Sequence, residues 1–170
     1  YDTQVANSLL GGSFSISYQG LVEEKIGLKV DKKESRTNWL RRPLSEAQLN
    51  YAASDVYYLI DLYMLQKEEF CTTNKLEWLE EEVNRIPELD PIIEVRKEKL
   101  FIIQKKEEKE ILIEFNNIIN KISKIEEINP TLFFSKQSQK ILINNILSLG
   151  LDDALKYVTR WRSRLIKEPL

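Results

Sequence analysis

A tyrosine and an aspartate lie four residues apart in LNYAASDVYYLIDLY, the stretch from Leu49 to Tyr63. If this stretch is helical, Tyr51 and Asp55 are neighbours on one face. A carboxylate can bind a divalent cation, and a phenol one turn away can orient the water that the cation activates. The phenol is a poor general base because its ordinary pKa is about 10. The pair therefore suggests metal-assisted hydrolysis, although the same spacing also occurs in helices that have no catalytic role.

The helix that must position this pair is predicted to begin at Ser45 and to run to about Phe70, with a bend near Ser54. Ser45 and Gln48 have the spacing of a capping box, in which each side chain bonds the backbone near the other. We expect the helix to pack by an apolar stripe and to carry Tyr51 and Asp55 at the edge of that stripe. The stripe consists of Leu49, Ala52, Ala53, Val56, Leu59, Ile60 and Tyr63.

Apolar periodicity and stop signals predict a mostly α fold. Leu28–Pro43 has no sustained period and is expected to be a long ordered loop. Isoleucines and a phenylalanine between Ile111 and Ile125 recur at spacings of 4, 3, 4 and 3, which predicts a seam that packs on partner helices. The other predicted helices are Thr3–Leu10, Ser17–Ile26, Asn74–Ile86, Ser135–Leu147 and Leu151–Ile166.

The composition narrows the kinds of site that the chain can build. Of its 170 residues 42% are hydrophobic and 31% are charged, which is typical of a soluble globular protein. The single cysteine, Cys71, excludes an internal disulfide and favours a reducing, cytoplasmic location. The sequence has no histidine, so a bound metal would need oxygen ligands, which favours Mg²⁺ or Mn²⁺. No apolar run has the length of a membrane span, and we expect no association with membranes.

Positive charge is concentrated in two regions of a chain whose net charge is −2. The first region precedes the helix that carries Tyr51, and its cations surround a tryptophan. A positively charged strip with an aromatic side chain suits single-stranded nucleic acid, by phosphate contact and base stacking. Alternatively, the tryptophan anchors the loop to the core and the arginines pair with nearby acids. The residues concerned are Lys32, Lys33, Arg36, Trp39, Arg41 and Arg42.

The second basic region lies on the last predicted helix. Lys156, Arg160, Arg164 and Lys167 follow one another at spacings of 4, 4 and 3, which predicts a basic stripe. A separate apolar stripe on the same helix faces the core and consists of Leu155, Val158, Trp161 and Leu165. The basic stripe suits contact with nucleic-acid phosphates, and a solvated face with no ligand explains it equally well.

Several longer stretches resemble the ribonuclease D family of 3′–5′ exonucleases, of the DEDDy type. They are DTQVANSLL at Asp2–Leu10, LVEEKIGLKVDKKESRTNWLRRPLSEAQLNYAASDVYYLIDLY at Leu21–Tyr63, and WLEEEVNR at Trp78–Arg85. In that family YAASD corresponds to the third exonuclease motif. The resemblance implies that Asp55 is a metal ligand and that Tyr51 orients the attacking water. It also implies that residues 1–86 form the C-terminal part of an α/β, ribonuclease H-like exonuclease domain.

The same resemblance implies that this chain holds only part of the site. The family uses four acidic residues, and three of them lie upstream of the segment that begins at Asp2. Gln4 stands where an Asp-x-Glu motif would need a carboxylate, so Asp2–Gln4 is not such a motif. We expect a two-metal Mg²⁺ or Mn²⁺ site completed by residues absent from this chain. The 170 residues alone are therefore expected to be inactive.

The C-terminal part carries a weaker resemblance to the helical HRDC-type domain of ribonuclease D. INPTLFFSKQSQKIL at Ile128–Leu142 and TRWRSRLIKEPL at Thr159–Leu170 carry it. The resemblance implies an HRDC-like nucleic-acid-binding domain over residues 98–170, after a proline-containing linker at 87–97.

Together these features predict part of a metal-dependent 3′–5′ exoribonuclease that trims RNA 3′ ends and releases 5′-mononucleotides. Precursors of tRNA are the expected substrate. Two alternatives stay open from the residues themselves. One is a helical module without catalytic activity that binds RNA or a protein, and the other is a 3′–5′ exonuclease that acts on DNA.

Overall fold

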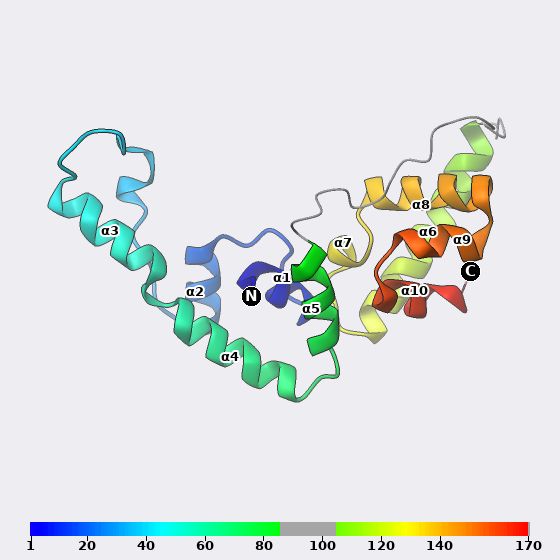
Figure 1. Cartoon of the computed structure of the whole chain (residues 1–170), viewed down its shortest axis with the longest axis horizontal. Helices are drawn as coiled ribbons and strands as arrows, with labels where there is room; N and C mark the ends of the chain where they lie inside the picture. The colour runs from blue at the N-terminus through cyan, green and yellow to red at the C-terminus, as the bar shows by residue number, and fades with distance from the viewer. Residues whose placement is uncertain (86–104, 170) are drawn as a thin grey trace.

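The computed structural model describes residues 1–85 and 105–169, and every regular element in these ranges is a helix (Figure 1). This confirms the mostly α expectation, and the linker predicted at 87–97 lies outside the described residues. The N-terminal elements are α1 (Thr3–Leu9), α2 (Tyr18–Ile26), the 3₁₀-helix η1 (Lys33–Arg36), α3 (Glu46–Tyr57), α4 (Leu59–Cys71) and α5 (Leu76–Arg85). The C-terminal elements are α6 (Lys105–Ile125), α7 (Pro130–Phe133), α8 (Lys136–Leu149), α9 (Leu151–Ala154), the 3₁₀-helix η3 (Leu155–Tyr157) and α10 (Arg160–Lys167).

Local capping chemistry explains where several helices begin and end. The Ser45 hydroxyl accepts a hydrogen bond from the Gln48 backbone N–H at 3.2 Å. The Gln48 side-chain oxygen accepts from the Ser45 backbone N–H at 3.0 Å. The predicted capping box at the start of α3 is therefore confirmed. Gly27 ends α2 with a φ of 80°, a left-handed conformation that glycine adopts without steric strain.

Two predicted helices are interrupted in the structure. The helix expected from Ser45 to Phe70 consists of α3 and α4, which meet at Tyr58 rather than bending near Ser54. The helix expected over Leu151–Ile166 is wrong as a single element, because extended backbone at Val158 and Thr159 separates η3 from α10. The expected loop Leu28–Pro43 contains the short helix η1.

The main hydrophobic core joins the N-terminal helices to the C-terminal ones. Trp78 of α5 stacks on Trp161 of α10, with ring centroids 5.0 Å apart and planes 12° from parallel. Phe133 of α7 also stacks on the Trp161 ring, with centroids 5.5 Å apart. From α6, Phe115 and Ile122 are buried as the predicted seam requires. Ile125, the last residue of the predicted seam, is exposed instead. Ile119, which the prediction did not include, is buried in the core.

A buried ion pair reinforces the contact between α5 and α10. The Arg162 guanidinium bonds both carboxylate oxygens of Glu82, and both side chains are only 12% exposed. Arg162 also donates to the carbonyl oxygens of Leu132 and Phe133, at 2.6 and 2.7 Å. Glu82 in turn accepts from Trp161 Nε1 at 2.9 Å. One arginine therefore holds α5, α7 and α10 together.

A polar joint connects the end of α1 to the turn after α6. The buried Lys75 ammonium donates to the carbonyl oxygens of Leu9 and Glu127, at 3.1 and 3.0 Å. Burial lowers the pKa of Lys75, against the opposite effect of nearby glutamates. Asn129 donates from its backbone to the Ser8 carbonyl and from its side chain to the Gly12 carbonyl. The joint satisfies backbone groups from both parts of the chain.

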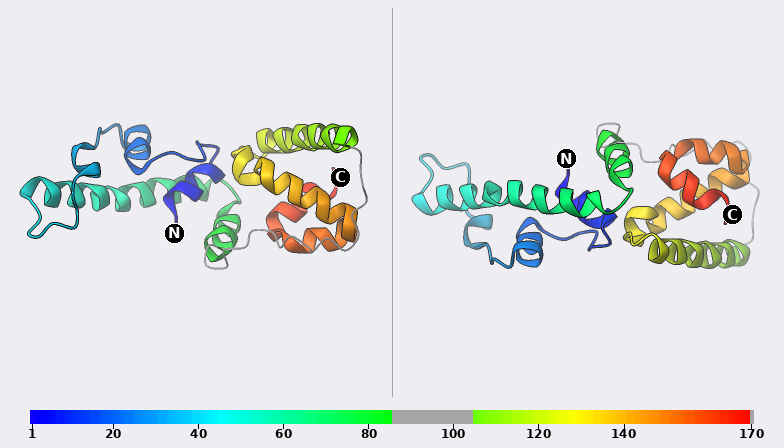
Figure 2. Two further views of the ribbon diagram at one scale, coloured as in Figure 1. Left: turned by 90° about the horizontal axis from the view of Figure 1, so that it is seen from above. Right: turned by 90° about the horizontal axis from the view of Figure 1, so that it is seen from below.

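Helices α3 and α4 run end to end away from the C-terminal helices, as both views in Figure 2 show. Helix α4 packs on α1 and α2 by a face that includes Leu62, Gln66 and Phe70, all buried. The apolar stripe that the sequence suggested as the packed face is exposed instead, with Ile60 at 70% and Leu49 at 55%. That expectation is therefore wrong for the described residues, and in α4 the opposite face is the one that is covered.

No helix within 1–85 or 105–169 is long and apolar enough to cross a membrane.

We predict that Glu82→Ala lowers the free energy of unfolding by about 3–5 kcal/mol, because it leaves the Arg162 charge buried without its partner. Urea denaturation followed by circular dichroism measures this. Glu23→Ala is the control, since Glu23 forms an exposed pair with Lys29 at 3.6 Å, and its effect should lie within about 0.5 kcal/mol. A decrease below about 1 kcal/mol for Glu82→Ala would show that the pair does not hold the helices together.

Candidate functional site

Asp55 lies on the side of α3 that faces α2, the Tyr51 ring lies beside Trp39, and both residues are partly exposed. The Gln19 side chain of α2 donates from Nε2 to Asp55 Oδ1 at 3.1 Å. Partial burial, together with a hydrogen bond to Asp55 and the charge of that carboxylate, raises the pKa of the Tyr51 phenol. Tyr51 is therefore a neutral hydrogen-bond donor at neutral pH, beside a carboxylate. The structure brings the two residues together as the helical spacing predicted.

Tyr18 of α2 contacts the backbone on both sides of Asp55. Its hydroxyl donates to the Ser54 carbonyl at 3.0 Å and accepts from the Tyr58 amide at 3.1 Å. In an unbroken helix the Tyr58 amide would bond the Ser54 carbonyl directly. Sequence reasoning missed both Tyr18 and Gln19, because neither belongs to an apolar period or to a recognised motif.

Trp39 lies against the Tyr51 ring, with centroids 5.9 Å apart and planes tilted by 51°. Its indole donates to the Glu34 carbonyl at 3.1 Å, so the ring is fixed within its own loop. The buried Gln48 amide ties this loop to the first turn of α3, because it donates to Thr37 Oγ1 and to the Asn38 carbonyl. The loop that carries Trp39 is therefore held in a fixed position beside the Tyr51 ring.

The cations of this loop are not equally available to a ligand. Lys33 pairs with Asp31 at 2.9 Å, and Arg42 Nη1 donates to the carbonyl oxygens of Trp39 and Arg41. Arg42 thus helps to fold the loop. Lys32, Arg36 and Arg41 are exposed, and none of them has an ion pair within the described ranges. These three are the cations best placed to meet a polyanion.

The described residues do not form a complete metal site by themselves. Within 1–85 and 105–169 there is no cluster of three or more carboxylate or thiol side chains that could hold a cation. Asp55 has the oxygen donors that Mg²⁺ and Mn²⁺ prefer, and it is accessible from solvent. Asp55 could therefore serve as one ligand of a divalent cation, and a cation held only by carboxylates would need ligands from beyond the described residues.

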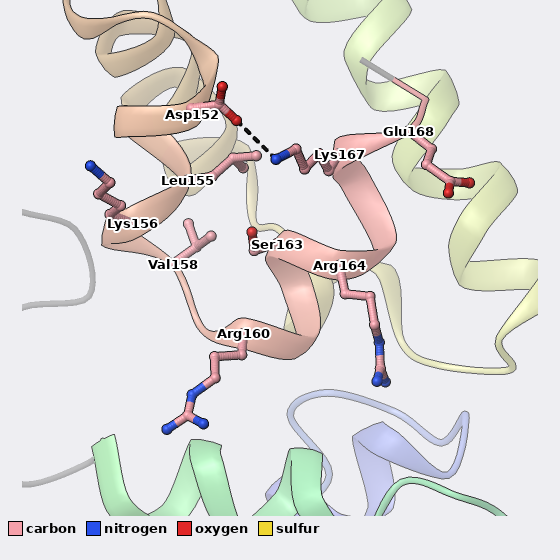
Figure 3. Close-up of a pocket in the computed structure, with 9 residues that line it drawn as sticks. All are labelled: Asp152, Leu155, Lys156, Val158, Arg160, Ser163, Arg164, Lys167 and Glu168. Atoms are coloured by element: carbon pink, nitrogen blue, oxygen red, sulfur yellow. Dashed lines mark ion pairs between the residues drawn. The ribbon is translucent and has the colours of Figure 1, made fainter.

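A second candidate site is a cavity of about 770 Å³ on α9, η3 and α10 (Figure 3). All four residues of the predicted basic stripe line it, although they do not belong to one helix: Lys156, Arg160, Arg164 and Lys167.

Acidic neighbours compensate part of the positive charge of this cavity. Lys167 pairs with Asp152 at 2.9 Å, and Lys156 pairs with Asp153 at 2.6 Å. The Arg164 guanidinium lies 5.9 Å from the centre of the Trp78 ring. Figure 3 shows Arg160 and Arg164 pointing away from the Asp152–Lys167 pair, and neither guanidinium has a carboxylate partner in the described part of the chain, although the Arg160 backbone amide donates to Glu81 at 2.8 Å. The two arginines are therefore the available cations.

Comparison with known proteins shows that the N-terminal part of the chain is similar in sequence to exonucleases. Residues 1–68 match the family described as 3′–5′ exonuclease. A ribonuclease D of Shewanella sp. strain ANA-3 is 48% identical over 88 residues, which cover 52% of this chain and 23% of that protein. A ribonuclease D of Bartonella henselae is 42% identical over 83 residues, 49% of this chain and 20% of that protein. The chain thus spans less than a quarter of the length of these relatives, and no solved structure matches it.

We predict that Gln48→Ala loosens the loop that carries Trp39. The change removes the bonds to Thr37 and Asn38 while leaving the Ser45 hydroxyl at the start of α3. Acrylamide quenching of tryptophan fluorescence should increase, because Trp39 is the only partly exposed tryptophan and the other two are buried. Gln137→Ala, at an exposed position on α8, should leave the quenching unchanged. Equal quenching in both variants would show that Gln48 does not hold the loop.

Proposed function

Because the N-terminal part of the chain belongs to the ribonuclease D family of 3′–5′ exonucleases, we propose that this protein provides the third acidic motif of a metal-dependent exoribonuclease. The observation that carries the proposal is the Tyr51–Asp55 pair, which lies on one face of α3 within the matched segment. The reaction is hydrolysis at RNA 3′ ends with release of 5′-mononucleotides. Precursors of tRNA in the cytoplasm are the proposed substrates.

Each residue of the pair has a distinct role in this proposal. Asp55 would supply one carboxylate ligand to Mg²⁺ or Mn²⁺, and the cations would make bound water a better nucleophile at neutral pH. Tyr51, whose raised pKa keeps its proton in place, would donate a hydrogen bond that orients the water or the scissile phosphate. Trp39, packed on the Tyr51 ring, restricts the direction in which the phenol points.

The other carboxylates of the centre require further protein to lie next to α3. The exposed stripe on α3 and α4 offers the surface for this, because a contiguous apolar patch on a soluble protein is commonly an interface. We propose that the remainder of the exonuclease domain covers this stripe. Its most exposed large members are Leu49, Val56 and Ile60, and Met64 of α4 is exposed as well.

The first experiment uses a chimera, in which the matched segment of this chain replaces its counterpart in the Shewanella ribonuclease D. The chimera should trim single-stranded RNA stepwise from the 3′ end. Asp55→Asn should lower the rate by about 100-fold or more, and Tyr51→Phe should lower it with little change in RNA affinity. Glu46→Gln, on the same helix and exposed, is the control. Wild-type trimming by Asp55→Asn would make the carboxylate structural, and trimming by the 170-residue chain alone would contradict the partial-site proposal.

Binding without catalysis is the second candidate function, and the basic cavity on α9, η3 and α10 favours it. Four cationic side chains around one concave surface suit the phosphates of RNA, and an HRDC-like role for residues 98–170 remains our proposal. RNA is proposed over DNA because the named relatives are ribonucleases. A DNA-directed exonuclease is the outcome that equal trimming of matched RNA and DNA strands would favour.

We predict that changing Arg160, Arg164 and Lys167 together to Gln weakens RNA binding by the 170-residue chain. The slope of log affinity against log salt should flatten by about 0.7 for each single-strand phosphate that the variant no longer neutralises. Fluorescence anisotropy over a salt series measures this. Changing Lys121, Lys124 and Lys140 together to Gln is the control, since these exposed lysines lie outside the cavity. An unaltered slope in the first variant would mean that the cavity is a solvated face.

A further inference from the structure

We propose that Tyr18 and Gln19, both in the first turn of α2, are positioning residues for the Tyr51–Asp55 pair. This inference rests on the proposed function only for its catalytic consequence. Its structural part concerns how α2 fixes the orientation of the Asp55 carboxylate, and it can be tested in the chain as it stands.

Gln19 acts directly on the carboxylate. Its Nε2 donates to Asp55 Oδ1 at 3.1 Å, across a sequence separation of 36 residues. The Tyr51 phenol lies one turn before the carboxylate on the same helix, whereas Gln19, the donor to Asp55, comes from another helix. A hydrogen bond from a neighbouring helix restricts the side-chain orientation of this aspartate, so less conformational entropy is given up when a ligand binds. Such outer contacts to a metal-binding side chain commonly affect affinity and activity about 10–100-fold.

Tyr18 acts on the backbone that carries the pair. Its hydroxyl lies between the Ser54 carbonyl and the Tyr58 amide, with distances of 3.0 and 3.1 Å. The hydroxyl therefore takes the place of one helical hydrogen bond and satisfies both of its groups. Insertion of a side chain into the hydrogen-bond ladder is a recognised cause of helix kinks. The Ser54 hydroxyl, which bonds the Tyr51 carbonyl at 2.7 Å, supports the same interruption.

Helix α2 contacts both α3 and α4, on the two sides of the interruption at Tyr58. On the α4 side, Leu21 and Val22 are buried with Leu62. At the far end of α2, Lys25 pairs with Glu69 of α4 at 2.8 Å. On the α3 side, the hydrogen bonds of α2 are those of Tyr18 and Gln19. Tyr18 and Gln19 thus link α2 to the part of α3 that carries Asp55, whereas α4 is also held by apolar packing and by the Lys25–Glu69 pair.

The first test is the side-chain orientation of Asp55 in the 170-residue chain, from three-bond NMR couplings at its β-carbon. Wild-type couplings should correspond to one χ1 orientation. Gln19→Leu, which removes the donor at similar size, and Tyr18→Phe, which removes only the hydroxyl, should each give averaged couplings. Gln137→Leu and Tyr57→Phe are the matched controls, because both positions are exposed and neither side chain has a hydrogen bond in the described part of the chain.

The second test is the Mn²⁺ dependence of RNA trimming by the chimera described above. Gln19→Leu should raise the Mn²⁺ concentration for half-maximal rate by about 10-fold or more, with KM for RNA unchanged. Excess Mn²⁺ should restore most of the rate, which a folding defect would not allow. Tyr18→Phe should shift the same midpoint in the same direction.

The two tests separate the two proposals. A single wild-type orientation of Asp55 that persists in both variants would overturn the positioning role, whatever the nuclease activity. Averaged couplings in the variants, with a wild-type chimera that does not trim RNA, would support the positioning role and refute the proposed function. An unchanged Mn²⁺ midpoint in an active Gln19→Leu chimera would overturn the catalytic part of the inference.

Discussion

The buried pairing of Arg162 with Glu82 is the interaction on which the described structure most depends. A guanidinium keeps its charge even where burial lowers its pKa, so it must find acceptors for its donors inside the protein. The acceptors come from the Glu82 carboxylate, from Thr159 and from two carbonyl groups of α7. These partners belong to segments far apart in sequence. The requirement to satisfy one charge therefore fixes the mutual placement of α5, α7 and the start of α10.

The aromatic stack beside this pair depends on the same placement. Trp78 and Trp161 overlap closely only when α5 and α10 cross at the point that the ion pair fixes. The Glu82 carboxylate also accepts from the Trp161 indole, so the polar and apolar contacts share one side chain. Residues similar to an exonuclease family and residues of the basic cavity are in this way parts of one core.

Most of the helices and the capping box at Ser45 could be predicted from the sequence, but the face by which α4 packs could not. Both faces of this helix carry apolar side chains, and periodicity alone does not tell which face the rest of the chain covers. Leu62, Gln66 and Phe70 are buried because α1 and α2 reach them, whereas Ile60 is exposed because no described segment does. The break at Tyr58 was also beyond the sequence, since it depends on a hydroxyl from a residue 40 positions away.

The two central residues of the candidate site could be predicted from the sequence, but the residues that contact them could not. Tyr51 and Asp55 are four apart on a helix, so their proximity follows from helical geometry alone. The contacts of Gln19, Tyr18 and Trp39 depend on how α2 and the loop fold back on α3, which local sequence does not encode. Counting basic residues likewise overstated the positive charge of these surfaces. Each of three lysines pairs with an exposed aspartate of the same chain: Lys33, Lys156 and Lys167.

The joint at Lys75 has a consequence for the order in which the chain folds during synthesis. The Lys75 ammonium is within reach of the Leu9 carbonyl early, but its other acceptor, on Glu127, is synthesised 52 residues later. The Ser8 and Gly12 carbonyls likewise have their hydrogen-bond donors on Asn129, which is synthesised much later. While the ribosome is still adding α6, a lysine and several backbone groups destined for burial remain hydrated. The N-terminal helices therefore reach their final packing only after the turn that follows α6 has left the ribosome.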